Sequence, residues 1–414
     1  MCSSAVIVIP TYNEAATAPR LVQCLFSSVI TGIRHWKISV LVVDGNSPDG
    51  TAERIREIQP RYPGLHLLIE REKEGLGAAY YKGFEYAIRH LMADVLIEFD
   101  GDFQHPPEAI PRLLEQIDQG ADFVLASRRI RGGCYPASWG LKRLLLSKLG
   151  GLVARLLLFF PSRDFFRVTD PTTGLRATRV AGCYERLDFS TFRDRGFGYK
   201  VEMLYHIVKM GARTREIPLK FGLRQAGDSK ITAQTPKEIL CTALRLRWFD
   251  ETSRRFLRFA IVGLSGFLIN SITLELFVRA NFVAALAGLF RPIAYHPTFG
   301  FVANSSAWAG ALAAECAILS NYLWNNFWTF ARYKALRFGE FLVNGVKFNL
   351  TSFGAILLQF LSIGFATFLI ANTRAVRQVC LVLTICLVII PYNWLMYNHV
   401  IWQTHRPEKG DSEK

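Results

Sequence analysis

The apolar residues of this chain are unevenly distributed, and this unevenness constrains the fold more than any other feature. Half of the 414 residues are hydrophobic. Up to about residue 248 they form short bursts between charged and Gly- or Pro-containing stretches, whereas beyond residue 256 they form runs near the length that crosses a bilayer. Four such runs lie at 256–278, 307–330, 348–370 and 379–402. The pattern predicts a water-soluble part followed by an all-α transmembrane domain of four helices.

This distribution divides the chain into four segments. They are a soluble domain at 1–233, amphipathic juxtamembrane helices at 234–255, a membrane domain at 256–402 and a tail at 403–414. The run at 282–290 is too short to span, and we expect it in the outer interface. Basic residues are more frequent between the second and third spans than between the third and fourth. The positive-inside rule then predicts a multi-pass protein with its soluble domain and both termini in the cytoplasm. The first apolar stretch, 5–9, is also too short for a signal peptide.

The formal net charge of +15 favours an anionic partner. Basic residues gather where the soluble and apolar parts meet, at Arg245, Arg247, Arg254, Arg255 and Arg258. Each basic residue near an anionic leaflet contributes about 1 kcal/mol, so a lipid bilayer is the expected partner. No nucleic-acid-binding motif accompanies the charge, and we expect no nucleic-acid partner. The eight cysteines show no metal-site or paired spacing, so neither zinc nor a disulfide framework is expected.

The soluble part alternates between short β-type bursts and helical segments. The bursts lie at 6–9, 39–43, 66–69, 95–99 and 123–126. This alternation predicts an α/β domain with a mostly parallel sheet, whose ligands bind at the carboxyl ends of the strands. Polar residues follow these ends, including Thr11, Asp44, Asp100, Asp102 and Arg128. We therefore expect a nucleotide site at this edge.

A pair of carboxylates follows the fourth burst. Asp100 and Asp102 are separated by Gly101, and Gln104 adds an amide oxygen two residues later. Such oxygens can bind Mg²⁺ or Mn²⁺ against a diphosphate. An isolated pair of this kind also occurs in ordinary turns, but its position directly after a buried strand favours the metal site.

Three other segments have both a functional and a structural interpretation. Asp44 can accept a hydrogen bond from a nucleobase, and the residues after it equally suit a turn and a helix start. Arg224 and Lys230, after a strand predicted at 217–221, can neutralise a leaving diphosphate or belong to a solvated basic loop. The apolar segment 141–160 is interrupted by basic residues. It fits a helix in the membrane interface better than a buried one.

Taken in order, these motifs resemble those of dolichol-phosphate mannosyltransferases in glycosyltransferase family 2. The resemblance covers essentially the whole chain, and it is carried by the segments 10–14, 42–51, 75–80, 100–106, 127–128, 170–176 and 224–230. The last part resembles a GtrA-like membrane domain, including the amide-rich segment 321–330. The resemblance implies a GT-A type fold. It also implies inverting transfer of a hexose to a polyprenyl or dolichyl phosphate, with GDP-mannose favoured over UDP-glucose as donor.

The resemblance also implies residue roles, grouped by ligand. The implied nucleotide-sugar contacts are Pro10, Tyr12, Glu14, Val42, Asp44, Asp100, Gly101, Asp102, Gln104, Arg224 and Lys230. The implied metal ligands are Asp100, Asp102 and Gln104, and the implied acceptor-phosphate ligands are Arg128, Arg143 and Ser147. Asp102, Arg224 and Lys230 are the implied catalytic residues. Two positions depart from the family pattern: Gly45 replaces a second acidic residue, and Gly101 replaces an alanine.

Two other functions remain alternatives. A processive polysaccharide synthase shares the nucleotide fold, but its Q-x-x-R-W signature would fall at 244–248, where the glutamine is absent. A non-catalytic lipid carrier or flippase would use the membrane helices alone. The intact carboxylate motif argues against this as the whole function.

Overall fold

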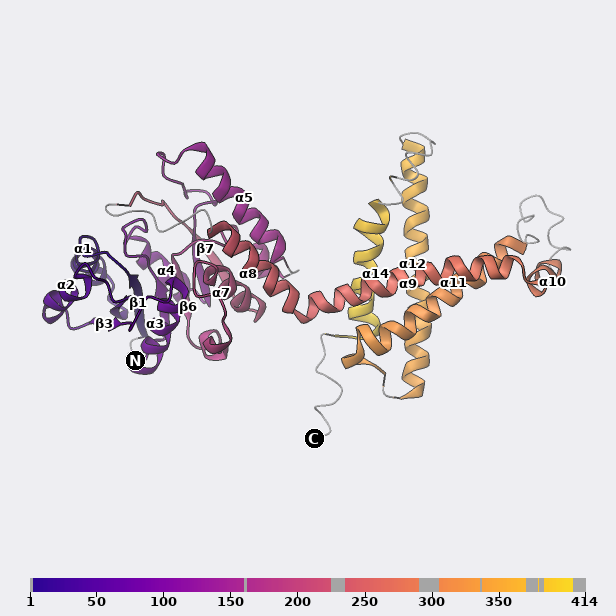
Figure 1. Ribbon diagram of the computed structural model, residues 1–414, viewed down its shortest axis with the longest axis horizontal. Helices are drawn as coiled ribbons and strands as arrows, with labels where there is room; N and C mark the ends of the chain where they lie inside the picture. Colours follow the sequence, from indigo (N-terminus) through magenta and orange to yellow (C-terminus); the bar gives the residue numbers. More distant parts are fainter. Residues whose placement is uncertain are drawn as a thin grey trace. The chain divides into compact units, whose positions relative to one another are not determined.

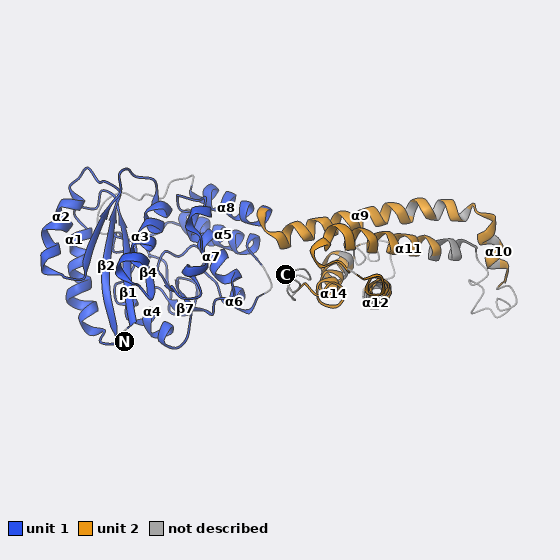
Figure 2. Cartoon of the chain, turned by 90° about the horizontal axis from the view of Figure 1, so that it is seen from below, with its two compact units in different colours: residues 1–248 blue, residues 249–414 orange. Residues whose placement is uncertain are grey.

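The computed structural model describes residues 3–159, 162–224, 235–289, 305–335, 337–369, 379 and 383–404. The chain forms two compact units, residues 1–248 and residues 249–414 (Figure 2). The helix α8 (Thr235–Phe249), which falls in the predicted juxtamembrane segment, packs Ala243 and Leu246 into the core of the first unit.

The first unit is built on a seven-stranded sheet (Figure 1). Its strands are β1 (Ser3–Thr11), β2 (Trp36–Asp44), β3 (Leu65–Ile69), β4 (Val95–Glu98), β5 (Phe123–Ser127), β6 (Arg176–Arg179) and β7 (Thr214–Pro218). Their order is β3-β2-β1-β4-β6-β5-β7. Neighbouring strands pair in parallel, except that β6 runs antiparallel to β4 and β5.

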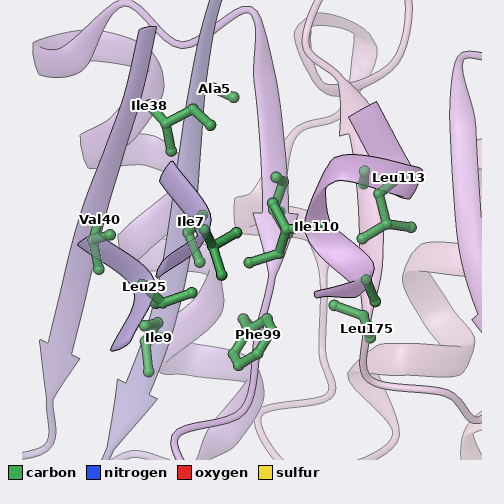
Figure 3. Close-up of a cluster of buried hydrophobic side chains, with 14 of the residues drawn as sticks. Ala5, Ile7, Ile9, Leu25, Ile38, Val40, Phe99, Ile110, Leu113 and Leu175 are labelled. Atoms are coloured by element: carbon green, nitrogen blue, oxygen red, sulfur yellow. The ribbon is translucent and has the colours of Figure 1, made fainter. Parts of the chain in front are cut away.

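Helices cover both faces of this sheet. Before α8, the α-helices of the first unit are α1 (Ala18–Cys24), α2 (Thr51–Ile58), α3 (Leu76–Leu91), α4 (Ala109–Asp118), α5 (Leu141–Leu157), α6 (Arg163–Phe166) and α7 (Tyr199–Lys209). Strand alternation decides which side chains meet which helix. On β1, Ile7 and Ile9 face a cluster with residues of α1, α2 and α4 (Figure 3), whereas Val6 and Val8 face a cluster with residues of α3 and α7. Each fully buried aliphatic side chain stabilises the fold by about 1.5–3 kcal/mol.

The expected mostly parallel α/β sheet is confirmed, with two corrections. The five predicted bursts all form strands. However, the strand predicted at 217–221 lies at Thr214–Pro218, and β6 was not expected. Sequence patterning hid β6 because its four residues, Arg-Ala-Thr-Arg, contain no apolar run. Arg176 is nevertheless fully buried, since its guanidinium donates to the carbonyl oxygens of Pro171, Thr173 and Lys200.

Helices and the short turns between them make up the described residues of the second unit. Its helices are α9 (Glu251–Val278), α10 (Asn281–Leu289), α11 (Ser305–Trp324), η8 (Asn325–Thr329), η9 (Ala331–Tyr333), α12 (Phe338–Leu369), η10 (Ile385–Ile389), α14 (Ile390–Met396) and η11 (Tyr397–Ile401). The helices α9 and α11 lie side by side (Figure 2). They and α12 fall on the first three predicted spans, and the pieces from η10 to η11 fall on the fourth. Within the described ranges, none of these helices combines the length and apolarity that a membrane crossing requires.

Candidate active site

The carboxyl edge of the sheet brings together side chains from three distant segments around Asp102. The Asp102 carboxylate, 7% exposed, accepts hydrogen bonds from Arg224 Nη2 at 2.9 Å and Nε at 3.2 Å. Arg224 Nη1 lies 3.6 Å from Glu14 Oε1. The guanidinium of Arg224 therefore lies between a carboxylate that follows β4 and one that follows β1.

Asp100 has a different set of cationic and polar neighbours. The Tyr80 hydroxyl donates to Oδ1 at 3.2 Å, and Lys200 Nζ lies 3.6 Å from Oδ2. Burial opposes ionisation of this carboxyl, but the positive charge of Lys200 and the hydrogen bond from Tyr80 outweigh it and lower its pKa to about 2. Asp100 is therefore an anion throughout the physiological pH range.

His105 supports Asp100 as a neutral imidazole. The backbone N–H of Asp100 donates to His105 Nδ1 at 3.3 Å, so this nitrogen carries no proton. Burial lowers the pKa of His105 further, which is consistent with that assignment. The contact of 3.7 Å between Nδ1 and Asp100 Oδ2 is thus not an ion pair.

Lys200 is a site residue that sequence reasoning missed. It lies near the start of α7, and its side chain is 10% exposed. A Cβ atom at Gly174 would lie 2.4 Å from Lys200 Nζ and 2.9 Å from Asp100 Oδ2, so only glycine leaves room for this pair. Gly174 belongs to the conspicuous segment 170–176, but no spacing in the sequence connects it with position 200.

The carboxylate pair suits a divalent cation that is completed by its substrate. Among the described residues, no three His, Cys, Asp or Glu side chains are close enough to bind a metal ion. Mg²⁺, however, commonly uses one or two carboxylates together with substrate phosphates and water. Gln104 Nε2 donates to the Gly222 carbonyl at 3.4 Å, which leaves its amide oxygen as a third hard donor. The donor set of Asp100, Asp102 and Gln104 therefore fits Mg²⁺ or Mn²⁺.

The residues expected around the nucleotide fall into two groups. Pro10 and Tyr12 are partly exposed at the end of β1, and Lys73 Nζ lies 3.8 Å from the centroid of the Tyr12 ring. Val42 and Asp44 are fully buried. The Asp44 carboxylate accepts from the Thr11 hydroxyl and from Ser47, and the Val42 side chain belongs to the core. Asp44 thus shapes the turn, and Val42 offers no side-chain surface to a ligand.

The structure explains both departures from the family pattern. A Cβ atom at Gly101 would make ordinary contacts of 3.4 Å or longer, so alanine would also fit. A Cβ atom at Gly45 would lie 3.5 Å from Glu70 Oε2. Glu70 Oε1 accepts from Lys82 Nζ at 2.7 Å. The Glu70 carboxylate, which follows β3, therefore lies close to position 45, where the family usually has an acidic residue.

Arg128, expected to bind the acceptor, forms a buried ion pair in the structure. Its Nε and Nη2 atoms each donate to Asp170 at 2.7 Å, in a bidentate arrangement. Burial opposes ionisation of Asp170, but Arg128 outweighs it and lowers the pKa of the carboxyl. In the described contacts, Arg128 therefore acts to stabilise the fold.

Arg143 is exposed on α5, and its side chain stacks on an aromatic ring. Its guanidinium lies 4.2 Å from the centroid of the Trp139 ring. Ser147 lies one turn further along the same face of α5, as expected. The ring centroids of Trp139 and Phe221 are 5.9 Å apart, and the Phe221 centroid lies 5.4 Å from the Arg128 guanidinium carbon. Two aromatic rings thus connect the two arginines.

Arg129 attaches α5 to the edge of the sheet. Its Nη2 atom donates to the carbonyl oxygens of Ser147 at 2.9 Å and Lys148 at 3.1 Å, in the middle of the helix. A Cβ atom at Gly151 would lie 2.1 Å from this nitrogen, so the glycine makes room for the contact. Lys230, the remaining predicted donor-site residue, lies outside the described residues.

Comparisons with known proteins give matches in both units of the chain. The pattern of the family described as "Glycosyl transferase family 2" matches residues 6–180, and that of "GtrA/DPMS, transmembrane domain" matches residues 258–402. The chain is 31% identical over 399 residues to the dolichol-phosphate mannosyltransferase of Pyrococcus furiosus, covering 96% of this chain and 99% of that protein. It is 35% identical over 238 residues to the undecaprenyl-phosphate mannosyltransferase of Micrococcus luteus, covering 58% and 91%.

A solved structure resembles part of the chain more distantly. It is the glucosyl-3-phosphoglycerate synthase of Mycobacterium tuberculosis in complex with phosphoglyceric acid. The TM-score is 0.43 at 19% sequence identity, and the match covers 59% of this chain and 79% of that one.

Proposed function

The chain belongs to the family of dolichol- and polyprenyl-phosphate mannosyltransferases, and from this membership we propose that it transfers mannose from GDP-mannose to a polyprenyl or dolichyl phosphate. The observation that carries the proposal is the arrangement at the sheet edge, where Arg224 lies between Asp102 and Glu14. A cation there, and carboxylates that can hold a metal, would stabilise a departing nucleoside diphosphate. A lipid carrier without catalytic activity needs neither.

The acceptor requires no general base. A lipid phosphate is already anionic near neutral pH, so its oxygen can attack the anomeric carbon directly. A single displacement of this kind inverts the anomeric centre and converts an α-linked donor into a β-linked lipid sugar. Catalysis then depends on positioning and on stabilising the leaving group.

We assign the residues to these tasks by their position. Asp100, Asp102 and Gln104 would hold Mg²⁺ or Mn²⁺, which supplies charge neutralisation for the diphosphate when bound. Arg224 contributes a second positive charge at the same edge, and we propose Lys230 as a third. Arg143 and Ser147 would align the acceptor phosphate on α5, because an arginine fork matches phosphate oxygens.

We also propose that the protein is bound to a membrane, with the first unit and both termini in the cytoplasm. The match of residues 258–402 to the transmembrane-domain family supports the membrane association, and the positive-inside rule supports the orientation. So does α5, where Leu141, Leu145 and Leu149 expose 71%, 47% and 56% of their surfaces. A surface of this kind suits the boundary between headgroups and acyl chains.

One assay separates the possible donors. The full-length protein in detergent is incubated with Mg²⁺, a polyprenyl phosphate and a panel of labelled sugar nucleotides that includes GDP-mannose and UDP-glucose. We expect label in the lipid fraction from GDP-mannose. Label from UDP-glucose alone would refute the proposed donor, and a growing polymer would indicate a processive synthase.

A further inference from the structure

Arg255, on the first turns of α9, lies among three aromatic rings of the second unit. Its guanidinium carbon is 5.9 Å from the centroid of Phe330, 5.5 Å from that of Tyr333 and 5.9 Å from that of Trp394. Tyr333 belongs to η9, Phe330 directly precedes η9, and Trp394 belongs to α14. Segments distant in the sequence therefore meet at the Arg255 side chain. A cation over aromatic faces is attracted to them, and the attraction grows as water is excluded.

The aromatic rings leave the hydrogen-bonding groups of Arg255 unsatisfied. Its Nε and Nη1 atoms are buried, and in the part of the chain that the structure describes no acceptor lies within hydrogen-bond distance of either. A buried N–H group without a partner is costly, and a ring face replaces an acceptor poorly. The planar fork of an arginine is complementary to the oxygens of a phosphate group.

Further unpaired polar atoms lie in the adjoining segment. Within the described residues, Asn325 Oδ1, Asn326 Nδ2 and Thr329 Oγ1 are buried without hydrogen-bond partners. All three belong to η8, which leads directly into Phe330. Asn326 is held in place because its Oδ1 atom accepts from Trp402 Nε1 at 3.2 Å. The amide-rich segment singled out in the sequence thus adjoins Arg255, and the transfer reaction does not use it.

We propose that Arg255 and η8 form a phosphate-binding site in the second unit, separate from the transfer site. Its ligand is a phosphate monoester or diester group, which would supply acceptor oxygens to Nε and Nη1 and would accept from the amide of Asn326. Arg258, three residues further along α9, adds positive charge at this end of the unit. The site depends on no residue of the sheet edge and does not require the proposed donor.

Lipid retention by the full-length protein tests this site. The wild type, Arg255→Gln and the matched control Arg254→Gln are titrated in detergent with dioleoyl phosphatidylglycerol, and bound lipids are counted by native mass spectrometry. The control removes the same charge from the exposed neighbouring residue. We expect Arg255→Gln to lose one bound lipid, with about tenfold weaker retention, and Arg254→Gln to behave like the wild type. Equal retention by all three proteins would overturn the proposal.

Two additions identify the ligand and protect the test against misfolding. Competition with inorganic phosphate distinguishes a free phosphate ligand from a lipid headgroup. Displacement of the lipid indicates that the site recognises the phosphate alone, whereas persistence of the lipid indicates that the acyl chains are also needed. Either result supports the proposal only if Arg255→Gln loses the bound lipid. If that variant does not fold, Arg255→Lys keeps the charge and removes the fork. A folded Arg255→Lys protein with wild-type retention would refute the site, and weakened retention would support it.

Discussion

The carboxyl edge of the sheet and the helix α5 both carry residues of the proposed site, but they hold their charges differently. At the sheet edge each carboxylate meets a cation, as the buried Asp102 meets Arg224 and the partly buried Asp100 meets Lys200. On α5, Arg143 is exposed and rests on the ring of Trp139. Charges at the edge are therefore part of the folded structure, whereas those on α5 are available to a ligand.

This difference separates stability from function. Removing one partner of a buried ion pair leaves an uncompensated charge and destabilises the fold, whereas removing an exposed charge does not. Arg128 tests the division, because the sequence grouped it with Arg143 and the structure pairs it with Asp170.

The largest effect is expected at Asp102. Asp102→Asn keeps the shape of the side chain, and Arg224 retains Glu14 as a partner, so the protein should fold. Transfer activity should fall by at least about 10³-fold, because charge stabilisation by a metal contributes several kcal/mol. Steady-state kinetics with and without EDTA measure this. The exposed substitution Glu53→Gln serves as a control, and full turnover in EDTA would disprove the metal assignment.

The next effect concerns Arg128. Arg128→Leu should lower the free energy of unfolding by about 3–5 kcal/mol, because Asp170 then stays buried without its partner. Chemical denaturation in detergent measures this loss. The double substitution Arg128→Leu with Asp170→Leu should recover part of it, and Arg143→Leu should cost little. Wild-type stability of Arg128→Leu would place this residue with the acceptor ligands, as the sequence first suggested.

Arg143 should affect the acceptor alone. Arg143→Ala should raise the KM for the lipid phosphate about tenfold, the size of a lost charge-assisted hydrogen bond, and leave donor affinity unchanged. Arg143→Lys should also impair the enzyme, since lysine lacks both the fork and the flat stacking surface. The control is Arg155→Ala on the same helix. Calorimetry that showed lost sugar-nucleotide binding with normal lipid dependence would assign Arg143 to the donor.

Lys200 should control the acid limb of the pH profile. In the wild type the pKa of Asp100 is lowered from 3.8 to about 2, so its carboxylate stabilises the fold above pH 3.8 and this contribution is lost as the pH falls toward 2. Lys200→Met removes the positive charge that contributes most to lowering the pKa of Asp100, so burial raises that pKa. Activity should then fall at a higher pH than in the wild type. The control is Lys209→Met on the same helix, and an acid limb that does not move would contradict this role.

Local sequence patterns predicted the parts of the molecule that depend on neighbours in the chain. The five apolar bursts became strands because alternation along a strand directly encodes burial on both sheet faces. The strand-end rule likewise predicted that polar residues gather at the carboxyl edge, where Asp102, Glu14 and Arg224 lie together in the structure. The strand β6 escaped because its stability comes from Arg176, whose acceptors lie on three other segments.

Pairing across long distances in the chain could not be predicted. Lys200 reaches Asp100 only because α7 packs where Gly174 leaves space, and no local pattern records this. The ion pair of Arg128 with Asp170 is of the same kind. A strand-end arginine is compatible with either a ligand or an internal partner, and only the folded chain selects between them.

The smallest effect, at two adjacent glycines of α5, tests whether this helix is held at a fixed distance from the sheet. Glycine within a helix costs about 0.5–1 kcal/mol relative to alanine, so Gly150→Ala, whose added Cβ meets nothing within 4 Å, should stabilise the protein by that amount. Gly151→Ala should lose this gain, because its Cβ would displace the Arg129 guanidinium from the carbonyl oxygens of Ser147 and Lys148. Since Arg129 joins β5 to α5, Gly151→Ala should also raise the KM for lipid phosphate a few-fold, whereas Gly150→Ala should not. Thermal unfolding and acceptor kinetics on the pair measure both effects. If the two variants had the same stability and the same KM, Arg129 would not fix the position of α5. The membrane, and not the sheet, would then position the acceptor residues.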